Sequence, residues 1–209
     1  MVGSAREEIL GKVRSALAGS ERSRWEDVRR EYRTERPAPD LVALFCERVA
    51  DYRATVQRVS SAELPGALVA AARSGGAGRL LTPPGVPQAW CSALEAEFEL
   101  VSSGLDVAEL DRVGGVITTA AVGIASTGSI VLDHRDGQGR RADSLVPDVH
   151  LCVVRESQVV DDVPAAVALL DPQQPLTFIS GPSATSDIEL NRVEGVHGPR
   201  TLTVLVVAD

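Results

Sequence analysis

The residues of this chain best suited to chemistry follow an apolar run near its end. Residues 178–189 and 195–200 hold glycines, hydroxyl side chains, two carboxylates and a histidine. Such residues after a buried strand commonly line a site, because loops at a strand end display binding groups on a rigid frame. We expect a small ligand to bind here, with His197 as the candidate catalytic residue and proton carrier. The other candidate ligand-binding residues of this stretch are Ser180, Gly181, Ser183, Asp187, Glu189 and Gly198.

Two further loops could hold an anion. Ser126-Thr127-Gly128 offers hydroxyls and unhindered backbone N–H groups that suit an oxyanion, or it forms an ordinary hairpin turn. Arg140 and Arg141 follow closely spaced glycines and could bind a carboxylate or phosphate bidentately. Alternatively, the two arginines belong to a surface loop and form ion pairs with nearby aspartates, Asp136 or Asp143.

The histidines are scattered and show no ligand spacing, so no metal site is predicted. His150 opens an apolar run, where we expect it to be half-buried, and it is a further candidate ligand-binding residue. His134 is expected in a loop. Cys46, Cys91 and Cys152 are single and far apart, which argues against zinc or iron–sulfur ligation within this chain.

A serine hydrolase is a weak interpretation of the same residues. Ser183, Asp187 and His197 include the three residue types, but a catalytic triad is defined by geometry and not by spacing. Ser186 and Glu189 also fit a capping box, so a helix start explains several of these polar residues.

Other cofactor classes are disfavoured by composition. Lys12 is the only lysine, which excludes a Schiff base or a lysine-containing P-loop in the rest of the chain. Gly137–Ala142 matches G-x-G-x-x-A, but Pro147 leaves little room for the helix that a dinucleotide site requires.

A net charge of −8 argues against nucleic acid as a partner, and we find no signal peptide or apolar membrane span. We therefore expect a cytoplasmic protein.

The 209 residues, 44% of them hydrophobic, suit one α/β domain with an appendage. Pro37-Ala-Pro39 predicts a boundary between an N-terminal helical appendage, residues 1–38, and an α/β domain, residues 39–209. Alternating strands and helices predict an open, mostly parallel sheet with flanking helices. Helices are expected at 4–18, 40–50, 62–72, 88–97 and 163–170, and strands at 55–59, 79–82, 98–101, 115–125, 129–132, 150–154, 176–180 and 201–207.

Several linked motifs resemble the lactate-utilisation protein C family, whose shared unit is the LUD domain. They are Ile124–Val131, Gly139–Arg141, Leu145–Pro147 with His150, Ile179–Ser183, Asp187–Glu189 and Gly195–Pro199. The resemblance implies a fold like that of the ribose-phosphate isomerase and CoA-transferase group (NagB/RpiA). It also implies an accessory role in oxidising L-lactate to pyruvate with two iron–sulfur partner proteins, and a small carboxylate or phosphorylated ligand.

Two positions depart from the family pattern. Ser126 stands where an acidic residue is usual, and Ala184 stands where an arginine is usual. Both changes remove a charge, so we expect a shifted ligand or a lost catalytic step. Two alternatives remain: a stand-alone enzyme acting on a phosphorylated or acyl substrate, and a non-catalytic scaffold whose N-terminal helices hold a partner or a second copy.

Overall fold

The computed structural model describes residues 5–20, 24–29, 40–185, 193–194 and 198–208. The chain separates into two units, Met1–Arg33 and Thr34–Asp209. In the first unit α1 (Ala5–Leu17) has no buried side chain, and η1 (Trp25–Asp27) is a short 3-10 helix. The domain boundary predicted after residue 38 falls outside the described residues and stays a prediction.

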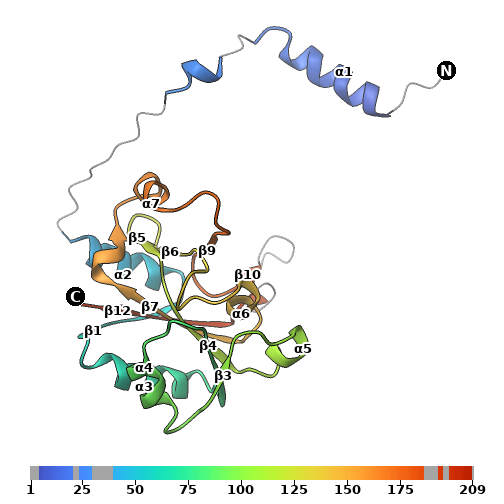
Figure 1. The fold of residues 1–209 in the computed structure, drawn as a ribbon. Coiled ribbons are helices and arrows are strands. Elements are labelled where there is room, and N and C mark those ends of the chain that lie inside the picture. The colour runs from blue at the N-terminus through green and yellow to red at the C-terminus, as the bar shows by residue number, and fades with distance from the viewer. Residues whose placement is uncertain (1–4, 21–23, 30–39, 186–192, 195–197, 209) are drawn as a thin grey trace. The chain divides into compact units, whose positions relative to one another are not determined.

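The second unit is built on a six-stranded parallel sheet (Figure 1). Its strands, in spatial order, are β1 (Thr55–Val59), β12 (Thr201–Val207), β7 (Val149–Arg155), β4 (Gly115–Thr119), β2 (Arg79–Thr82) and β3 (Glu99–Ser102). The central strands β7 and β12 are almost entirely buried, which explains their nearly continuous apolar sequences. The predicted open parallel sheet with flanking helices is confirmed. The specific likeness to the isomerase and CoA-transferase group stays a prediction.

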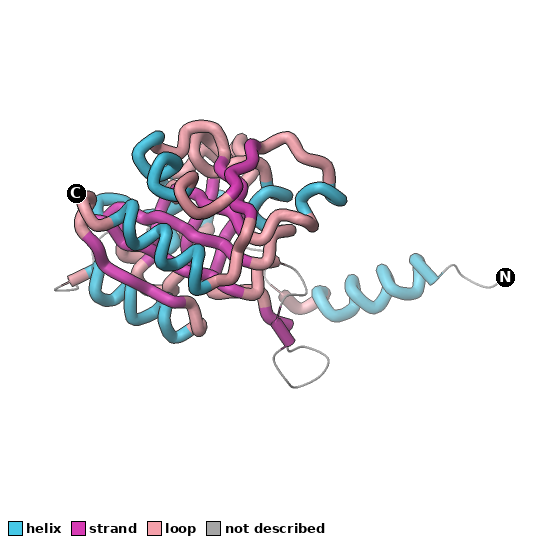
Figure 2. The backbone as a smooth tube through the Cα atoms, turned by 90° about the horizontal axis from the view of Figure 1, so that it is seen from below, coloured by secondary structure: helices cyan, strands magenta, loops and turns pink. Residues whose placement is uncertain are grey.

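Helices cover both faces of this sheet (Figures 1 and 2). On one face, α3 (Leu64–Ser74) and α4 (Gln88–Leu94) pack against the side chains of Leu151 and Leu205. On the other face, α2 (Leu41–Asp51) packs Phe45 against Cys152 and Val204. Successive residues of β7 and β12 therefore enter different cores, as the two-residue period of a strand requires.

A second sheet of four short strands lies on the α2 side. Its order is β8 (Val159–Val160), β5 (Val122–Ile124), β6 (Ser129–Leu132) and β9 (Thr177–Ile179). Strands β5 and β6 form an antiparallel hairpin, and α7 (Val163–Leu169) packs Ala166 against the hairpin. A separate pair, β10 (Ala184–Thr185) and β11 (Val193–Glu194), is also antiparallel.

The single strand expected over residues 115–125 is wrong, because the chain changes sheets within it. The N–H of Thr119 donates to the carbonyl of Gly137, and two residues later the N–H of Ala121 donates to Val131 of the small sheet. Three short helices were also not predicted: α5 (Val107–Leu110), α6 (Arg141–Leu145) and η2 (Glu156–Gln158). Each has at most five residues, too few for a helical period to stand out.

Candidate functional site

Two of the predicted loops meet through a chain of hydroxyl groups. Thr127 Oγ1 donates to Ser129 Oγ at 2.9 Å, and Ser129 Oγ lies 2.7 Å from Ser180 Oγ. Antiparallel pairing of β6 with β9 brings these loops together, although 51 residues separate Ser129 from Ser180. The small sheet therefore places the Thr127 and Ser180 loops side by side.

The glycines of these two loops have a packing role. Gly128 has φ +62°, and a Cβ there would meet the backbone of Arg48 at 2.5 Å. Gly181 has φ +83°, and a Cβ there would meet Tyr52 Cβ at 2.5 Å. Both glycines therefore let their loops approach the end of α2 closely, in a backbone conformation that L-residues rarely adopt.

The first cavity, which we call the Ser180 cavity, lies between β9 and the first residues of β7 and β12. Its volume is about 260 Å³. No charged side chain lines it among the residues that the structure describes. It therefore offers hydroxyls, backbone groups and apolar walls. The lining residues are Ser144, Leu145, His150, Thr177, Phe178, Ile179, Ser180, Gly181, Pro182, Ser183, Gly198, Pro199 and Leu202.

His150 forms the floor of the Ser180 cavity, and the prediction that it is half-buried is wrong, because its side chain is fully buried between the strands of the sheet. Its Nε2 lies 2.7 Å from Thr118 Oγ1, and both side chains are buried. Burial disfavours the charged imidazole and lowers the pKa of His150 to about 4. Burial also raises the pKa of the neighbouring Cys152 thiol to about 12, although a hydrogen bond with Thr118 opposes this shift. At neutral pH the cavity floor is therefore uncharged.

The second cavity, which we call the His134 cleft, begins beyond the carboxyl ends of β2 and β3. Its volume is about 500 Å³, within the usual range for small-ligand sites. Unlike the Ser180 cavity, it is lined by several charged side chains. The lining residues are Pro84, Ser103, His134, Arg135, Asp136, Gly139, Arg140, Arg141 and Pro175.

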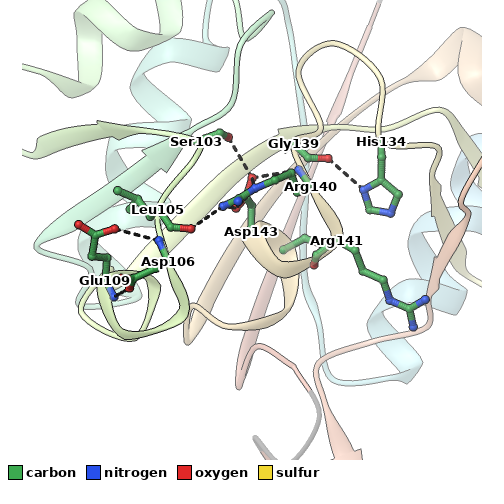
Figure 3. Close-up of polar contacts among 10 residues, drawn as sticks. Ser103, Leu105, Asp106, Glu109, His134, Gly139, Arg140, Arg141 and Asp143 are labelled. Carbon is green, nitrogen blue, oxygen red and sulfur yellow. Dashed lines mark hydrogen bonds and ion pairs between the residues drawn. The ribbon is translucent and has the colours of Figure 1, made fainter.

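Arg140 is held by a buried carboxylate and does not point freely into the cleft (Figure 3). Its Nη2 donates to Asp143 Oδ1 at 2.7 Å and to the carbonyl of Leu105 at 2.8 Å. Asp143 is fully buried, and Ser103 Oγ also donates to it at 3.0 Å. Burial alone would raise the pKa of Asp143, but the hydrogen bonds from Arg140 and Ser103 outweigh it and lower that pKa.

Arg141 points the other way, on the side of α6 where His134 lies (Figure 3). Its side chain is exposed, and no described residue forms an ion pair with it. His134 is anchored: Nδ1 lies 3.0 Å from the carbonyl oxygen of Gly139, and Nε2 lies 2.8 Å from Thr177 Oγ1. Because a carbonyl can only accept, the proton of this contact belongs to Nδ1. Thr177 also lines the Ser180 cavity, so this hydrogen bond connects the two cavities.

The predicted site residues therefore divide among three places. His150, Ser180, Gly181, Ser183 and Gly198 line the Ser180 cavity, and Arg140 and Arg141 line the His134 cleft. Ser126, Thr127 and Gly128 form the β5–β6 turn, which lines neither cavity. His197, Asp187 and Glu189 lie outside the described residues, so their assignments stay predictions.

His134 and Thr177 are the site residues that sequence reasoning missed. His134 has φ +58°, an unusual conformation for a residue other than glycine, and its partner is 43 residues away. The nearby Gly137 and Gly139 gave a signal of a tight loop, but not of this long-range contact. Among described residues we find no cluster of three potential metal ligands, and no helix there is long and apolar enough to span a membrane.

Comparison with known proteins places this fold in the class of LUD-domain proteins, whose family model matches residues 107–207. Lactate utilization protein C of Deinococcus radiodurans is 45% identical over 213 residues, covering 97% of this chain and 95% of that protein. Lactate utilization protein C of Geobacillus kaustophilus is 34% identical over 173 residues, which cover 72% of this chain and 71% of that protein. The crystal structure of a DUF162 family protein from D. radiodurans has a TM-score of 0.68 and 44% identity, covering 80% of this chain and 96% of that one.

This chain belongs to the lactate utilization protein C family. The resemblance inferred from the linked motifs between Ile124 and Pro199 is confirmed, and it extends to nearly the whole chain.

Proposed function

We propose that this protein serves in L-lactate utilisation, as an accessory component of the oxidation of L-lactate to pyruvate. The observation that supports this most is the 45% identity to a lactate utilization protein C along almost the full length of both chains. A match of this extent includes the loops around both cavities, not only the core of the sheet.

The oxidation releases two electrons and two protons, so the proposal requires an electron acceptor. We assign this role to iron–sulfur partner proteins, because four thiolates usually hold such a cluster and this chain has three cysteines. Cys46, Cys91 and Cys152 are free thiols in α2, α4 and β7. The contribution of this chain is then to bind a small anionic ligand and to hold it near its partners.

The test is growth on L-lactate as sole carbon source after deletion of the gene from its host. Growth is expected to fail on L-lactate, to continue on pyruvate, and to return with the native protein. A His197→Ala variant tests the candidate proton carrier in the same strain. Unimpaired growth of the deletion strain on L-lactate would contradict the proposed function.

The two departures from the family pattern can be tested in the same strain. A variant with Ser126→Glu and Ala184→Arg restores both charges. If these positions have shifted the ligand, the variant will change ligand binding or growth on L-lactate. An unchanged variant in both measurements would show that the departures do not affect function.

A scaffold is the second candidate function, and one observation favours it. Ile9, Val13 and Leu17 recur every four residues of α1, on one helical face, and are 61%, 47% and 52% exposed. An apolar stripe of this kind suits a partner or a second copy. Removal of residues 1–20 should then abolish association with the partners, or self-association, while leaving ligand binding unchanged.

A further inference from the structure

The cationic groups of the His134 cleft are not equivalent. Arg140 is paired with Asp143 at 2.7 Å, and Arg135 lies 3.4 Å from Asp133 and 3.6 Å from Asp171. Arg141 is the remaining arginine of the lining, and no carboxylate pairs with it in the described part of the chain.

The geometry of α6 explains why Arg141 stays available. Both oxygens of Asp143 already accept hydrogen bonds, from the side chain and backbone N–H of Arg140 and from Ser103. Arg140 precedes α6 as its N-cap residue and has an extended backbone, whereas Arg141 is the first residue of the helix, so the two side chains leave the chain in different directions. Figure 3 shows the result: the Arg140 side chain is directed toward Asp143 and Leu105, and the Arg141 side chain points away from them.

We propose that Arg141 binds the carboxylate group of a small ligand in the His134 cleft. Its planar guanidinium matches the two oxygens of a carboxylate, and such charge-assisted pairs are the stronger hydrogen bonds of proteins. The inference deepens the proposed function and rests on it for the choice of L-lactate and pyruvate as probes. It also assigns Arg140 a structural role, in place of the ligand-binding role predicted from the sequence.

Two other residues of the cleft favour a small organic carboxylate over inorganic phosphate. Pro84 and Pro175 supply apolar surface for a short carbon chain.

His134 acts as a positioning residue for the wall beside Arg141. Both of its ring nitrogens are occupied, at 3.0 Å from the Gly139 carbonyl oxygen and at 2.8 Å from Thr177 Oγ1. These bonds fix the ring plane from two separate segments, the loop of Gly139 and the start of β9. The ring therefore shapes the space for the ligand, and a proton transfer through Nε2 would first require Thr177 to move.

The experiment measures binding of sodium L-lactate, sodium pyruvate and inorganic phosphate to the full chain by isothermal titration calorimetry. Sodium chloride at equal ionic strength corrects for screening. The native protein should bind a carboxylate more tightly than phosphate. Arg141→Gln should weaken carboxylate binding by at least about tenfold, since one charge-assisted contact is lost. Arg141→Lys keeps the charge but loses the planar guanidinium, so its affinity for the carboxylate should lie between those of the native protein and Arg141→Gln.

Arg112→Gln is the matched control, because Arg112 is also exposed and lies outside the cleft. It should bind as the native protein does. Circular dichroism and the melting temperature without ligand check that Arg141→Gln is folded, as expected for an exposed side chain. Equal carboxylate binding by Arg141→Gln and the native protein would overturn the proposal, as would tighter binding of phosphate, or no binding of either carboxylate.

Growth on L-lactate separates this inference from the proposed function. If the deletion strain cannot grow but the native protein binds no carboxylate, the site is wrong and the function stands. If carboxylate binding depends on Arg141 but the deletion strain grows normally, the site stands and the function is wrong.

Discussion

Thr118 Oγ1 and His150 Nε2 lie 2.7 Å apart inside the core, where the two side chains are 0% and 1% exposed. They come from neighbouring parallel strands, β4 and β7. Burial lowers the pKa of His150 to about 4, so the ring stays neutral in the folded protein well below the usual range of a histidine.

This pKa predicts a specific dependence of stability on pH. Above pH 6.5 the ring is neutral in both folded and unfolded chains and contributes no pH dependence. Between pH 6.5 and about 4 the unfolded chain binds a proton that the folded chain does not, so stability falls as pH falls. The free energy of unfolding should decrease by about 2 to 3 kcal/mol from pH 7.5 to pH 4.5 on account of this group.

Urea unfolding of the native protein and of His150→Gln at both pH values measures this contribution. Other titrating groups act alike in the two proteins, so the difference between them isolates His150. The variant should lose less stability on acidification than the native protein. Equal losses would contradict the assignment of a neutral, buried ring.

Two glycine-to-alanine substitutions should change the stability of the protein in opposite directions, one through close packing and the other through helix propensity. Gly128→Ala places a Cβ 2.5 Å from the Arg48 backbone at φ +62°, and should destabilise the protein by more than about 2 kcal/mol. Gly66→Ala lies in α3 with no atom within 4 Å of the new Cβ, and should stabilise it by about 0.5 to 1 kcal/mol. Thermal melts of both variants provide the test, and a neutral Gly128→Ala would mean that the turn can move away from α2.

The sequence predicted the large sheet well because its signals are local. Strands 55–59, 79–82 and 201–207 were predicted with the bounds that β1, β2 and β12 have. Their apolar runs follow from burial on a parallel sheet, which a single sequence reveals. The switch between sheets at residues 120–121 depends on hydrogen bonds to Gly137 and Val131. Because these partners are distant in sequence, the local pattern of apolar residues does not reveal the switch.

The loops of the candidate site could be predicted because their signals are also local, whereas the contacts between them could not. Glycines and hydroxyls identified the loops around Ser126, Arg140 and Ser180, because these residue types show where a chain turns. Which of the two arginines is held by a carboxylate was not predictable. It depends on Asp143 being buried and on Ser103 reaching it from 40 residues away.

The thiols should differ in reactivity according to their burial. Burial raises the pKa of Cys152 to about 12, and its side chain is 0% exposed, whereas Cys46 and Cys91 are partly exposed. N-ethylmaleimide at pH 8 should therefore modify Cys46 and Cys91 first, and Cys152 only on unfolding. Mass spectrometry of peptides from native and urea-treated protein tests this order. Early labelling of Cys152 in the native protein would contradict its place in the core.

The ion pair of Arg140 with Asp143 should stabilise the protein more than a comparable pair on the surface. Asp143 is 0% exposed, so Asp143→Asn leaves an amide among donors arranged for a carboxylate, and should cost about 2 kcal/mol. Glu97→Gln is the matched control: Glu97 pairs with Arg73 at 2.6 Å, but the side chains are 40% and 65% exposed, and the change should cost less than about 1 kcal/mol. Hydrogen bonds lower the pKa of Asp143, so its stabilisation is present above its ordinary pKa of 3.8 and is lost as pH falls further. Urea unfolding at pH 7 compares the two variants, and equal costs would show that burial of Asp143 adds nothing to the pair.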